Sequence, residues 1–355
     1  MRRFSVAIVF VLALALLALA CSSSGKGAKT PSTPAPSGNG TTSTTAVAPG
    51  PGIGHVFVIN LENKNYEKTW GSASPATYLN GTLAPKGQLL AQYYGTSHAS
   101  LGNYITQISG QPSNPETNAD CTTFTEYRNG RGCVYPPKVK TVADQLDGAG
   151  KTWKSYQEGM STPCRHPKIG AGDTTLIARK GDMYATRHNP FVYFHSIIDT
   201  PRCAANVVDL TALDTDLAAT DSTPNLVYIT PDLCHDGHDT PCVDGQPGGL
   251  VSADKFLTTW VAKILQSPAY LTDGLLVITL DEADADASAC CGQKGPGGGR
   301  IGALLLSARV KAGTTNDTPY NHYSLLCSIE DMFGLAHLGR AGAAGNKCFG
   351  KDVYS

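Results

Sequence analysis

The feature that most constrains the fold is an apolar run that stops abruptly at two acids. Residues 275–280 (LLVITL) predict a strand buried on both faces, and Asp281 and Glu282 follow it at once. Such runs are typical of parallel sheets covered by helices. Ligands of open α/β sheets bind just beyond the carboxyl ends of the strands. Two adjacent carboxylates would repel each other there unless a positive charge lay between them, so the pattern indicates either a divalent cation or a simple acidic turn.

Three further apolar runs predict strands of the same sheet, at residues 55–61, 226–230 and 301–307. Helical spacing of apolar residues follows the second run over 255–266 and the third over 322–333. Alternation of strands with helices predicts an α/β fold with a mostly parallel central sheet sandwiched by helices.

Polar side chains follow three of these four strands. Glu62 and Asn63 follow the first, and Asp232, His235 and His238 crowd the end of the second, with Asp236 among them. Acids or histidines at three strand ends predict a functional site at their common edge.

A hydroxyl group can serve as nucleophile at such a site. Ser100 precedes an apolar helical face, where it could merely cap the helix or could lie under an anion held by the helix N-terminus. A metal-bound serine hydroxyl is acidified and becomes a nucleophile, and Asn103 could donate to a phosphoryl oxygen. A Ser-His-Asp hydrolase is disfavoured, because the chain has no Gly-x-Ser-x-Gly elbow and the acids would have no role.

The N-terminal residues predict export. Arg2 and Arg3 precede an apolar run over residues 6–20 that is short for a membrane span, and Cys21 follows Ala20 as in a bacterial lipoprotein signal. Lipid attachment at Cys21 is favoured over plain secretion or an uncleaved anchor. We expect residues 1–21 to be a signal peptide, 22–52 a disordered Ser/Thr/Pro/Gly linker and 53–355 one catalytic domain.

Cysteine content and charge narrow the class of protein further. Ten cysteines besides Cys21 predict up to five disulfides, whose pairing the sequence leaves open, and the adjacent Cys290 and Cys291 are expected to take different partners. The chain has no Cys-x-x-Cys pair, and this absence disfavours a structural zinc site. With 28 basic and 29 acidic residues the chain lacks the basic excess of a nucleic-acid-binding protein.

Five motifs together resemble a known family. They are HVFVINLENK (55–64), TSHASLGNY (96–104), YITPDLCHDG (228–237), TLDE (279–282) and HYSLLCSIEDMFGL (322–335). In this order they are similar to the bacterial phosphoesterase family of phospholipases C, acid phosphatases and the secreted mycobacterial phosphatidylinositol-3-phosphatase, in the alkaline-phosphatase-like superfamily.

The resemblance implies a role for each matching residue. It implies a metal shell of Glu62, Asn63, Ser100, Asp281 and Glu282, joined by Asp232. It further implies catalytic roles for Ser100 as nucleophile and for His322 and His235, and substrate binding by Asn103, His188 and His238. The oxygen-rich shell favours Ca²⁺, Mg²⁺ or Mn²⁺ over Zn²⁺.

The resemblance also implies an activity and leaves rivals open. We expect an exported, metal-dependent phosphoric ester hydrolase acting on a small-molecule or lipid-headgroup phosphate ester, with membrane contact only through the N-terminal lipid. A phosphomonoesterase, possibly specific for phosphoinositides, is favoured over a phospholipase C-type phosphodiesterase, and a non-catalytic surface binding protein is the more distant alternative. Lys64 and Gly102 depart from the phospholipase C pattern and leave the substrate open. A sulfatase is disfavoured because Ser100 lacks the Cys/Ser-x-Pro-x-Arg context.

Overall fold

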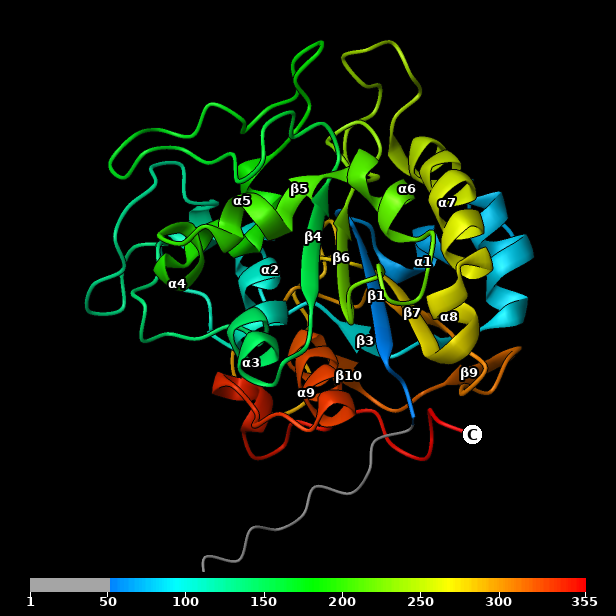
Figure 1. The fold of residues 1–355 in the computed structure, drawn as a ribbon. Coiled ribbons are helices and arrows are strands. Elements are labelled where there is room, and N and C mark those ends of the chain that lie inside the picture. Colours follow the sequence, from blue (N-terminus) through cyan, green and yellow to red (C-terminus); the bar gives the residue numbers. More distant parts are fainter. Residues whose placement is uncertain (1–51) are drawn as a thin grey trace, which may run out of the picture. The chain divides into compact units, whose positions relative to one another are not determined.

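The computed structural model describes residues 52–355 (Figure 1). The predicted signal segment, and all of the predicted linker except Gly52, lie outside these residues and remain predictions. In the part that is described, no helix combines the length and the apolar character that crossing a membrane requires.

An eight-stranded sheet forms the centre of the domain, in the order β5-β4-β6-β1-β7-β8-β2-β9. Its strands are β1 (His55–Leu61), β2 (Gln88–Leu90), β4 (Trp153–Gln157), β5 (Val207–Asp209), β6 (Leu226–Thr230), β7 (Gly274–Leu280), β8 (Ala303–Leu306) and β9 (Thr314–Asn316). A small second sheet pairs β3 (Tyr93–Tyr94) with β10 (Tyr320–Asn321). The four predicted strands are β1, β6, β7 and β8, and every residue in them is buried.

Strand direction confirms the mostly parallel sheet. Every neighbouring pair is parallel except those of β8, which runs antiparallel to β7 and β2. In the β1–β7 ladder Leu61 lies opposite Leu280, so the two strands end at the same level. The residues that follow them therefore begin side by side.

Helices cover both faces of the sheet (Figure 1). They are α1 (Tyr66–Thr69), α2 (Ser100–Ser109), α3 (Val142–Gly148), α4 (His195–Ile198), α5 (Arg202–Asn206), α6 (Leu213–Asp216), α7 (Gly249–Gln266), α8 (Pro268–Asp273) and α9 (His322–Phe333). α2, α3 and α9 pack together on one side, and α7 and α8 lie on the other. Two apolar layers explain why the central strands carry no polar face.

α2 is the helix that matters most for the site. All ten of its residues are buried, and Gly110 ends it in the left-handed conformation at φ 66°. A Cβ at Gly110 would lie 2.2 Å from the Leu338 carbonyl oxygen, so only glycine fits this end. Burial on all sides fixes the position of Ser100 at the other end.

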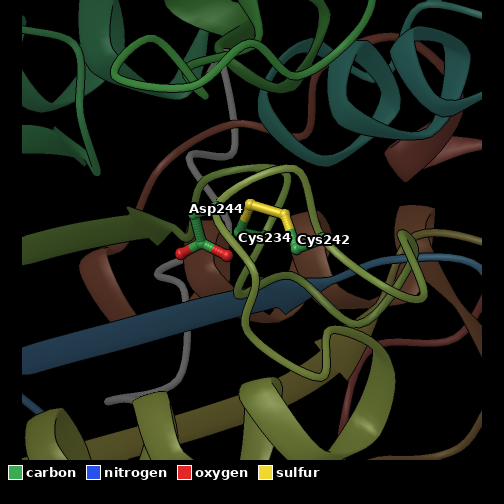
Figure 2. Close-up of side chains that lie close together, drawn as sticks. All are labelled: Cys234, Cys242 and Asp244. Carbon is green, nitrogen blue, oxygen red and sulfur yellow. A yellow bond between two sulfur atoms is a disulfide. The ribbon is translucent and has the colours of Figure 1, made fainter.

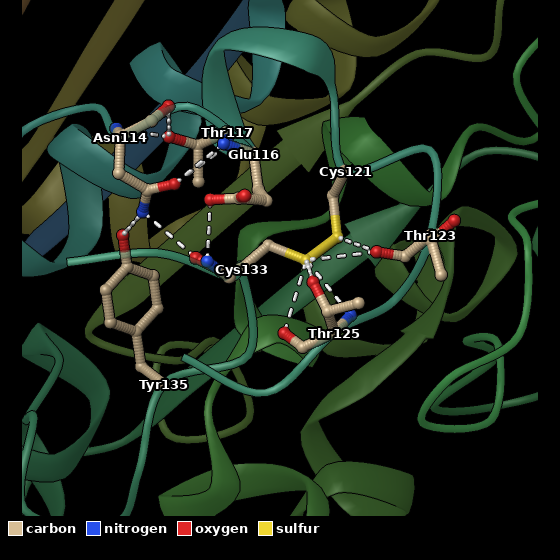
Figure 3. The surroundings of a disulfide bond; sticks show 9 residues. Asn114, Glu116, Thr117, Cys121, Thr123, Thr125, Cys133 and Tyr135 are labelled. Atoms are coloured by element: carbon tan, nitrogen blue, oxygen red, sulfur yellow. Dashed lines mark hydrogen bonds between the residues drawn. A yellow bond between two sulfur atoms is a disulfide. The ribbon is translucent and has the colours of Figure 1, made fainter. Parts of the chain in front are cut away.

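Five disulfides link the ten cysteines, which confirms the predicted upper number. The pairs are Cys121–Cys133, Cys164–Cys203, Cys234–Cys242, Cys290–Cys291 and Cys327–Cys348. Cys121–Cys133 closes a polar loop, and Asn114 and Glu116 form hydrogen bonds to the backbone of Gly132 in this loop (Figure 3). The expectation that Cys290 and Cys291 take different partners is wrong, because the two adjacent residues pair with each other.

Candidate active site

The carboxylates that follow β1 and β7 converge at one edge of the sheet. The Asp281 backbone N–H donates to the Leu61 carbonyl at 2.9 Å, which continues the ladder past the last strand residue. The side chains of Glu62, Asp281 and Glu282 are all buried there. Two distant segments thus place three acids in one region, as their positions in the sequence predict.

Ser100 lies against these acids. It is the first residue of α2 and is 5% exposed, and its Oγ donates to Glu62 Oε2 at 3.1 Å. One turn later, the Tyr104 hydroxyl donates to Glu62 Oε1 at 2.7 Å. Both oxygens of Glu62 are therefore held by α2, and the partial positive charge of the helix N-terminus lies at the Ser100 hydroxyl.

Two asparagine amides hold Glu282. Asn63 Nδ2 donates to Glu282 Oε1 at 2.7 Å and Asn103 Nδ2 donates to Oε2 at 2.9 Å. Asn103 Oδ1 accepts from the backbone of Thr96 and Ser97, which fixes the segment leading into α2. The Asn103 amide is thus engaged within the protein, and Asn103 does not line the cavity described below.

The charges of these buried acids would be offset by a bound cation. Burial raises the pKa of Glu62 and of Asp281, and burial together with the Glu62 charge raises the pKa of Glu282 to about 9. Asp281 Oδ2 is buried and has no hydrogen-bond partner. A divalent cation would offset the repulsion and use this oxygen, so the donor set fits a hard metal ion.

A cavity of about 390 Å³ opens over Ser100. Asn63, Ser100, Glu282 and His238 line it together with three residues that sequence reasoning did not assign, His98, Asp120 and Arg187. Burial alone would lower the pKa of Arg187. The negative charges of Glu62, Asp120 and Asp236 outweigh burial, so the pKa of Arg187 is raised. The cavity therefore presents a permanent cation beside the serine.

His238 belongs to a loop that a disulfide closes. Cys234–Cys242 ties the chain together after β6, with Asp244 beside it (Figure 2). The Asp239 carboxylate, 2.8 Å from His238 Nδ1, raises the pKa of this histidine. His238 is thus held at the cavity in a form that gains a proton readily.

His188 lies against Glu62 without lining the cavity. Its ring stacks on Tyr104 with 5.2 Å between centroids, and Nε2 lies 3.2 Å from Glu62 Oε1. Burial and the charge of Arg187 lower the pKa of His188. Neither ring nitrogen has a hydrogen-bond partner, and Nδ1 faces Asp236 Oδ2 at 3.7 Å.

His322 lies behind the acids. Its Nε2 is 2.7 Å from the Asp281 carbonyl oxygen, while Nδ1 lies 3.1 Å from Gln107 Nε2 and 3.2 Å from the Tyr93 hydroxyl. Burial lowers its pKa to about 4. Both ring nitrogens have hydrogen-bond partners within the protein, so His322 positions Asp281. This arrangement differs from the catalytic role that the resemblance implies for His322.

Asp232 and His235 also differ from the expected arrangement. They form a separate group with Glu158, in which His235 Nδ1 lies 3.0 Å from Glu158 Oε1 and 3.3 Å from Asp232 Oδ1. Neither lines the cavity over Ser100. Their strand end lies beside β4, and the side chains turn toward Glu158, so the structure does not bring them into the shell of Glu62 and Asp281.

The distances between potential metal-ligand atoms distinguish the group of Glu158, Asp232 and His235 from the acids around Ser100. Within residues 52–355, three sets of His, Cys, Asp or Glu bring their ligand atoms within 4.8 Å of one another. Two of these sets use disulfide sulfurs, and the third is Glu158, Asp232 and His235. Glu62, Asp281 and Glu282 are not among these sets, so their carboxylate oxygens do not all lie within 4.8 Å of one another.

The residues that sequence reasoning did not assign come from irregular segments. Arg187 stands beside His188, which the family resemblance marks, but no motif marks the arginine itself. His98 lies inside the TSHASLGNY motif, two residues before the serine. No pattern in the sequence marks Asp120, which accepts a hydrogen bond from the Leu101 backbone at 3.0 Å.

Comparisons with known proteins give a consistent assignment. Residues 75–336 match the model of the Phosphoesterase family. An acid phosphatase of Aspergillus fumigatus is 27% identical over 80% of this chain and 56% of its own length, and a phosphatidylinositol-3-phosphatase of Mycobacterium tuberculosis is 25% identical over 81% and 79%. The chain spans less than two thirds of the fungal relatives it matches.

A solved structure supports the fold. A protein of the alkaline phosphatase superfamily from Vibrio parahaemolyticus superposes with a TM-score of 0.52 at 13% identity, over 82% of this chain and 69% of its own. At this identity the likeness concerns the arrangement of sheet and helices, which agrees with the predicted alkaline-phosphatase-like fold.

Proposed function

This chain belongs to the phosphoesterase family, and we propose that it is a metal-dependent phosphomonoesterase that uses Ser100 as its nucleophile. Two curated relatives support the choice of monoester, since one is named an acid phosphatase and the other a phosphatidylinositol-3-phosphatase. The observation that carries the proposal is the Ser100 hydroxyl itself. It lies at a buried helix N-terminus, 3.1 Å from a carboxylate, and it lines a cavity that a partly buried arginine also lines.

The cavity can bind a phosphoryl group through charge. Arg187 offers a permanent cation, and His98 and His238 add ring nitrogens that carry charge when protonated. A monoester dianion has more charge than a diester and gains more from these groups. Asp120 and Glu282 line the same cavity, so charge favours the monoester over the diester once a bound cation offsets these carboxylates.

Five residues would hold the metal ion: Glu62, Asn63, Ser100, Asp281 and Glu282. Their oxygen donors suit Ca²⁺, Mg²⁺ or Mn²⁺. When bound, the cation acidifies the serine hydroxyl and neutralises charge on the phosphoryl oxygens. His322 would act indirectly by fixing the Asp281 carbonyl, and Asn103 by fixing Glu282.

The chain's own groups supply the proton transfers. Ser100 Oγ attacks phosphorus while its proton passes toward Glu62 Oε2, the acceptor of its hydrogen bond. The ester oxygen leaves, and His238 donates a proton to it. Water then hydrolyses the phosphoserine and releases inorganic phosphate.

Export and lipid attachment remain part of the proposal. Five disulfides in one domain are typical of proteins that fold in an oxidising compartment. The signal segment and Cys21 predicted from the sequence would place the domain at the cell surface.

The test compares p-nitrophenyl phosphate with its bis-ester, each assayed with Ca²⁺, Mg²⁺, Mn²⁺ and Zn²⁺. Ser100→Ala should lower kcat/KM for the monoester by at least about a thousandfold. Ser109→Ala is the matched control, because this buried serine lies at the other end of the same helix and donates only to Ile105. Equal rates for wild type and Ser100→Ala would end the nucleophile assignment.

The same assay separates the rival functions. A diester preference of about tenfold or more, about 1.4 kcal/mol, would indicate the phospholipase C-type alternative. Stoichiometric metal binding without turnover of any ester would indicate a binding protein.

A further inference from the structure

A second cavity lies directly beside the one over Ser100. Its volume is about 400 Å³, and His98 lines both cavities. The residues on either side of His98 divide between them: Thr96 and Ser97 line the second cavity, and Ala99 and Ser100 line the first. A substrate whose phosphate lies over Ser100 can therefore extend past His98 into the second cavity.

The lining of this second cavity is cationic. Lys294 and Arg340 line it together with His98, and no carboxylate does. Neither Lys294 nor Arg340 lies within 4.0 Å of a carboxylate oxygen anywhere in residues 52–355, whereas His98 Nδ1 lies 3.8 Å from Glu282 Oε1. Hydroxyl groups add to the donors, since Ser113 Oγ is buried without a partner and Tyr323 lines the wall. Cations and hydroxyls without a counter-charge are suited to an anion.

Both cations belong to segments that are fastened to the active site. Gln293, next to Lys294, donates through Nε2 to the Thr96 carbonyl at 2.8 Å. The same loop is joined to the chain before Ser100 by the Gly298 backbone N–H, which donates to the Gly95 carbonyl at 3.0 Å. The Arg340 backbone N–H donates to the Gly110 carbonyl at 2.9 Å, at the end of α2. These bonds hold the second cavity in register with Ser100.

We propose that Lys294 and Arg340 form a second anion-binding subsite, so that the preferred substrate is a phosphomonoester whose leaving group carries another phosphate. This inference rests on the proposed phosphomonoesterase activity. The second phosphate is either a second monoester of a water-soluble molecule or the phosphodiester of a lipid headgroup. Both present the same charged oxygens to the subsite.

The test uses alkanediol bisphosphates of two, four and six carbons, each compared with the monophosphate of the same diol. At its best chain length the bisphosphate should exceed the monophosphate about tenfold in kcat/KM, the value of one good charged contact. The excess should shrink as salt is added, because a partly exposed subsite is screened. The double variant Lys294→Ala/Arg340→Ala should abolish the excess and leave the monophosphate rate within about twofold.

Arg128→Ala/Lys138→Ala is the control, since it removes the same charge from exposed residues that do not line either cavity. It should keep the preference. Equal rates of the two substrate types in wild type, or an equal loss of both in the Lys294/Arg340 variant, would overturn the subsite. A short-chain phosphatidylinositol 3-phosphate, compared with inositol 3-phosphate, shows which source is preferred, and a dependence on Lys294 and Arg340 with either source upholds the subsite.

Binding separates this inference from the proposed function. If no ester is hydrolysed, the phosphomonoesterase proposal fails, and titration calorimetry of the Ser100→Ala protein with the bisphosphates decides the subsite. Tighter binding of a bisphosphate than of its monophosphate, lost on removal of Lys294 and Arg340, upholds it. Equal binding of the two overturns it.

Discussion

Tyr104→Phe removes one hydroxyl and should weaken metal binding although it replaces none of the proposed metal ligands. The Tyr104 hydroxyl donates to Glu62 Oε1 at 2.7 Å, and the side chain is fully buried. This bond lowers the pKa of Glu62 against the larger effect of burial, which raises it. Without the hydroxyl, Glu62 holds its proton to higher pH, and that proton competes with the metal ion.

The size of the effect follows from the strength of the bond. A hydrogen bond to a charged group contributes about 1.5–3 kcal/mol, which corresponds to roughly 10–100-fold in an equilibrium constant. We therefore expect Mn²⁺ affinity, measured by titration calorimetry at pH 6, to fall by about 10–100-fold, the range found when groups behind metal ligands are removed. Because the cause is proton competition, the loss should be smaller at pH 8.

Tyr156→Phe is the matched control. Its hydroxyl donates to the Asp216 carboxylate at 2.6 Å, at a site that does not line the cavity over Ser100. Both variants should lose a similar free energy of unfolding, and only Tyr104→Phe should lose metal affinity. Equal metal affinity for Tyr104→Phe and wild type at pH 6 would refute the reasoning.

Three further predictions concern single features of the structure. Arg187→Ala should lower kcat/KM on a phosphomonoester about a hundredfold, and Arg187→Lys should restore part of it, whereas an unchanged rate would remove Arg187 from the site. Burial raises the pKa of Glu330 to about 8, so this group lowers wild-type stability as the pH rises from about 4.5 to 8, while the unfolded chain alone loses its proton. Glu330→Gln should remove this group's share of the slope, on the order of a few kcal/mol in urea denaturation between pH 5 and pH 8, and leave the share of Glu62, Asp281 and Glu282. Cys121→Ser/Cys133→Ser should lower the free energy of unfolding by about 2–4 kcal/mol in the same assay, and it should also lower the activity, because Thr122 of the closed loop and Asp120 beside it line the cavity.

The sequence predicted the central sheet well for a physical reason. Buried parallel strands must be apolar on both faces, so β1, β6, β7 and β8 appear as continuous runs. Adjacent strand ends then bring Glu62, Asp281 and Glu282 together without further information. The sequence left open whether Ser100 caps its helix or begins it, and in the structure α2 begins at Ser100.

The rest of the site depends on side-chain direction, which no repeating pattern encodes. His322 lies in a matching motif at the start of α9, yet its ring points to the Asp281 carbonyl. Asp232 and His235 follow a correct strand but turn toward Glu158. Arg187 and Asp120 lie in long segments with little regular structure. Tertiary packing and disulfides determine the conformation of these segments, and no sequence period marks it. The Cys290–Cys291 disulfide likewise shows that the sequence does not determine which cysteines pair.

The central claim is that the Ser100 oxygen takes the phosphoryl group. The most direct measurement quenches the metal-loaded enzyme with acid during turnover and maps phosphorylation by tandem mass spectrometry, with Ser97 and Ser109 as internal controls. We predict one phosphoryl group on Ser100, absent without substrate. Turnover with no phosphate on Ser100, or with the phosphate on another residue, would contradict the account.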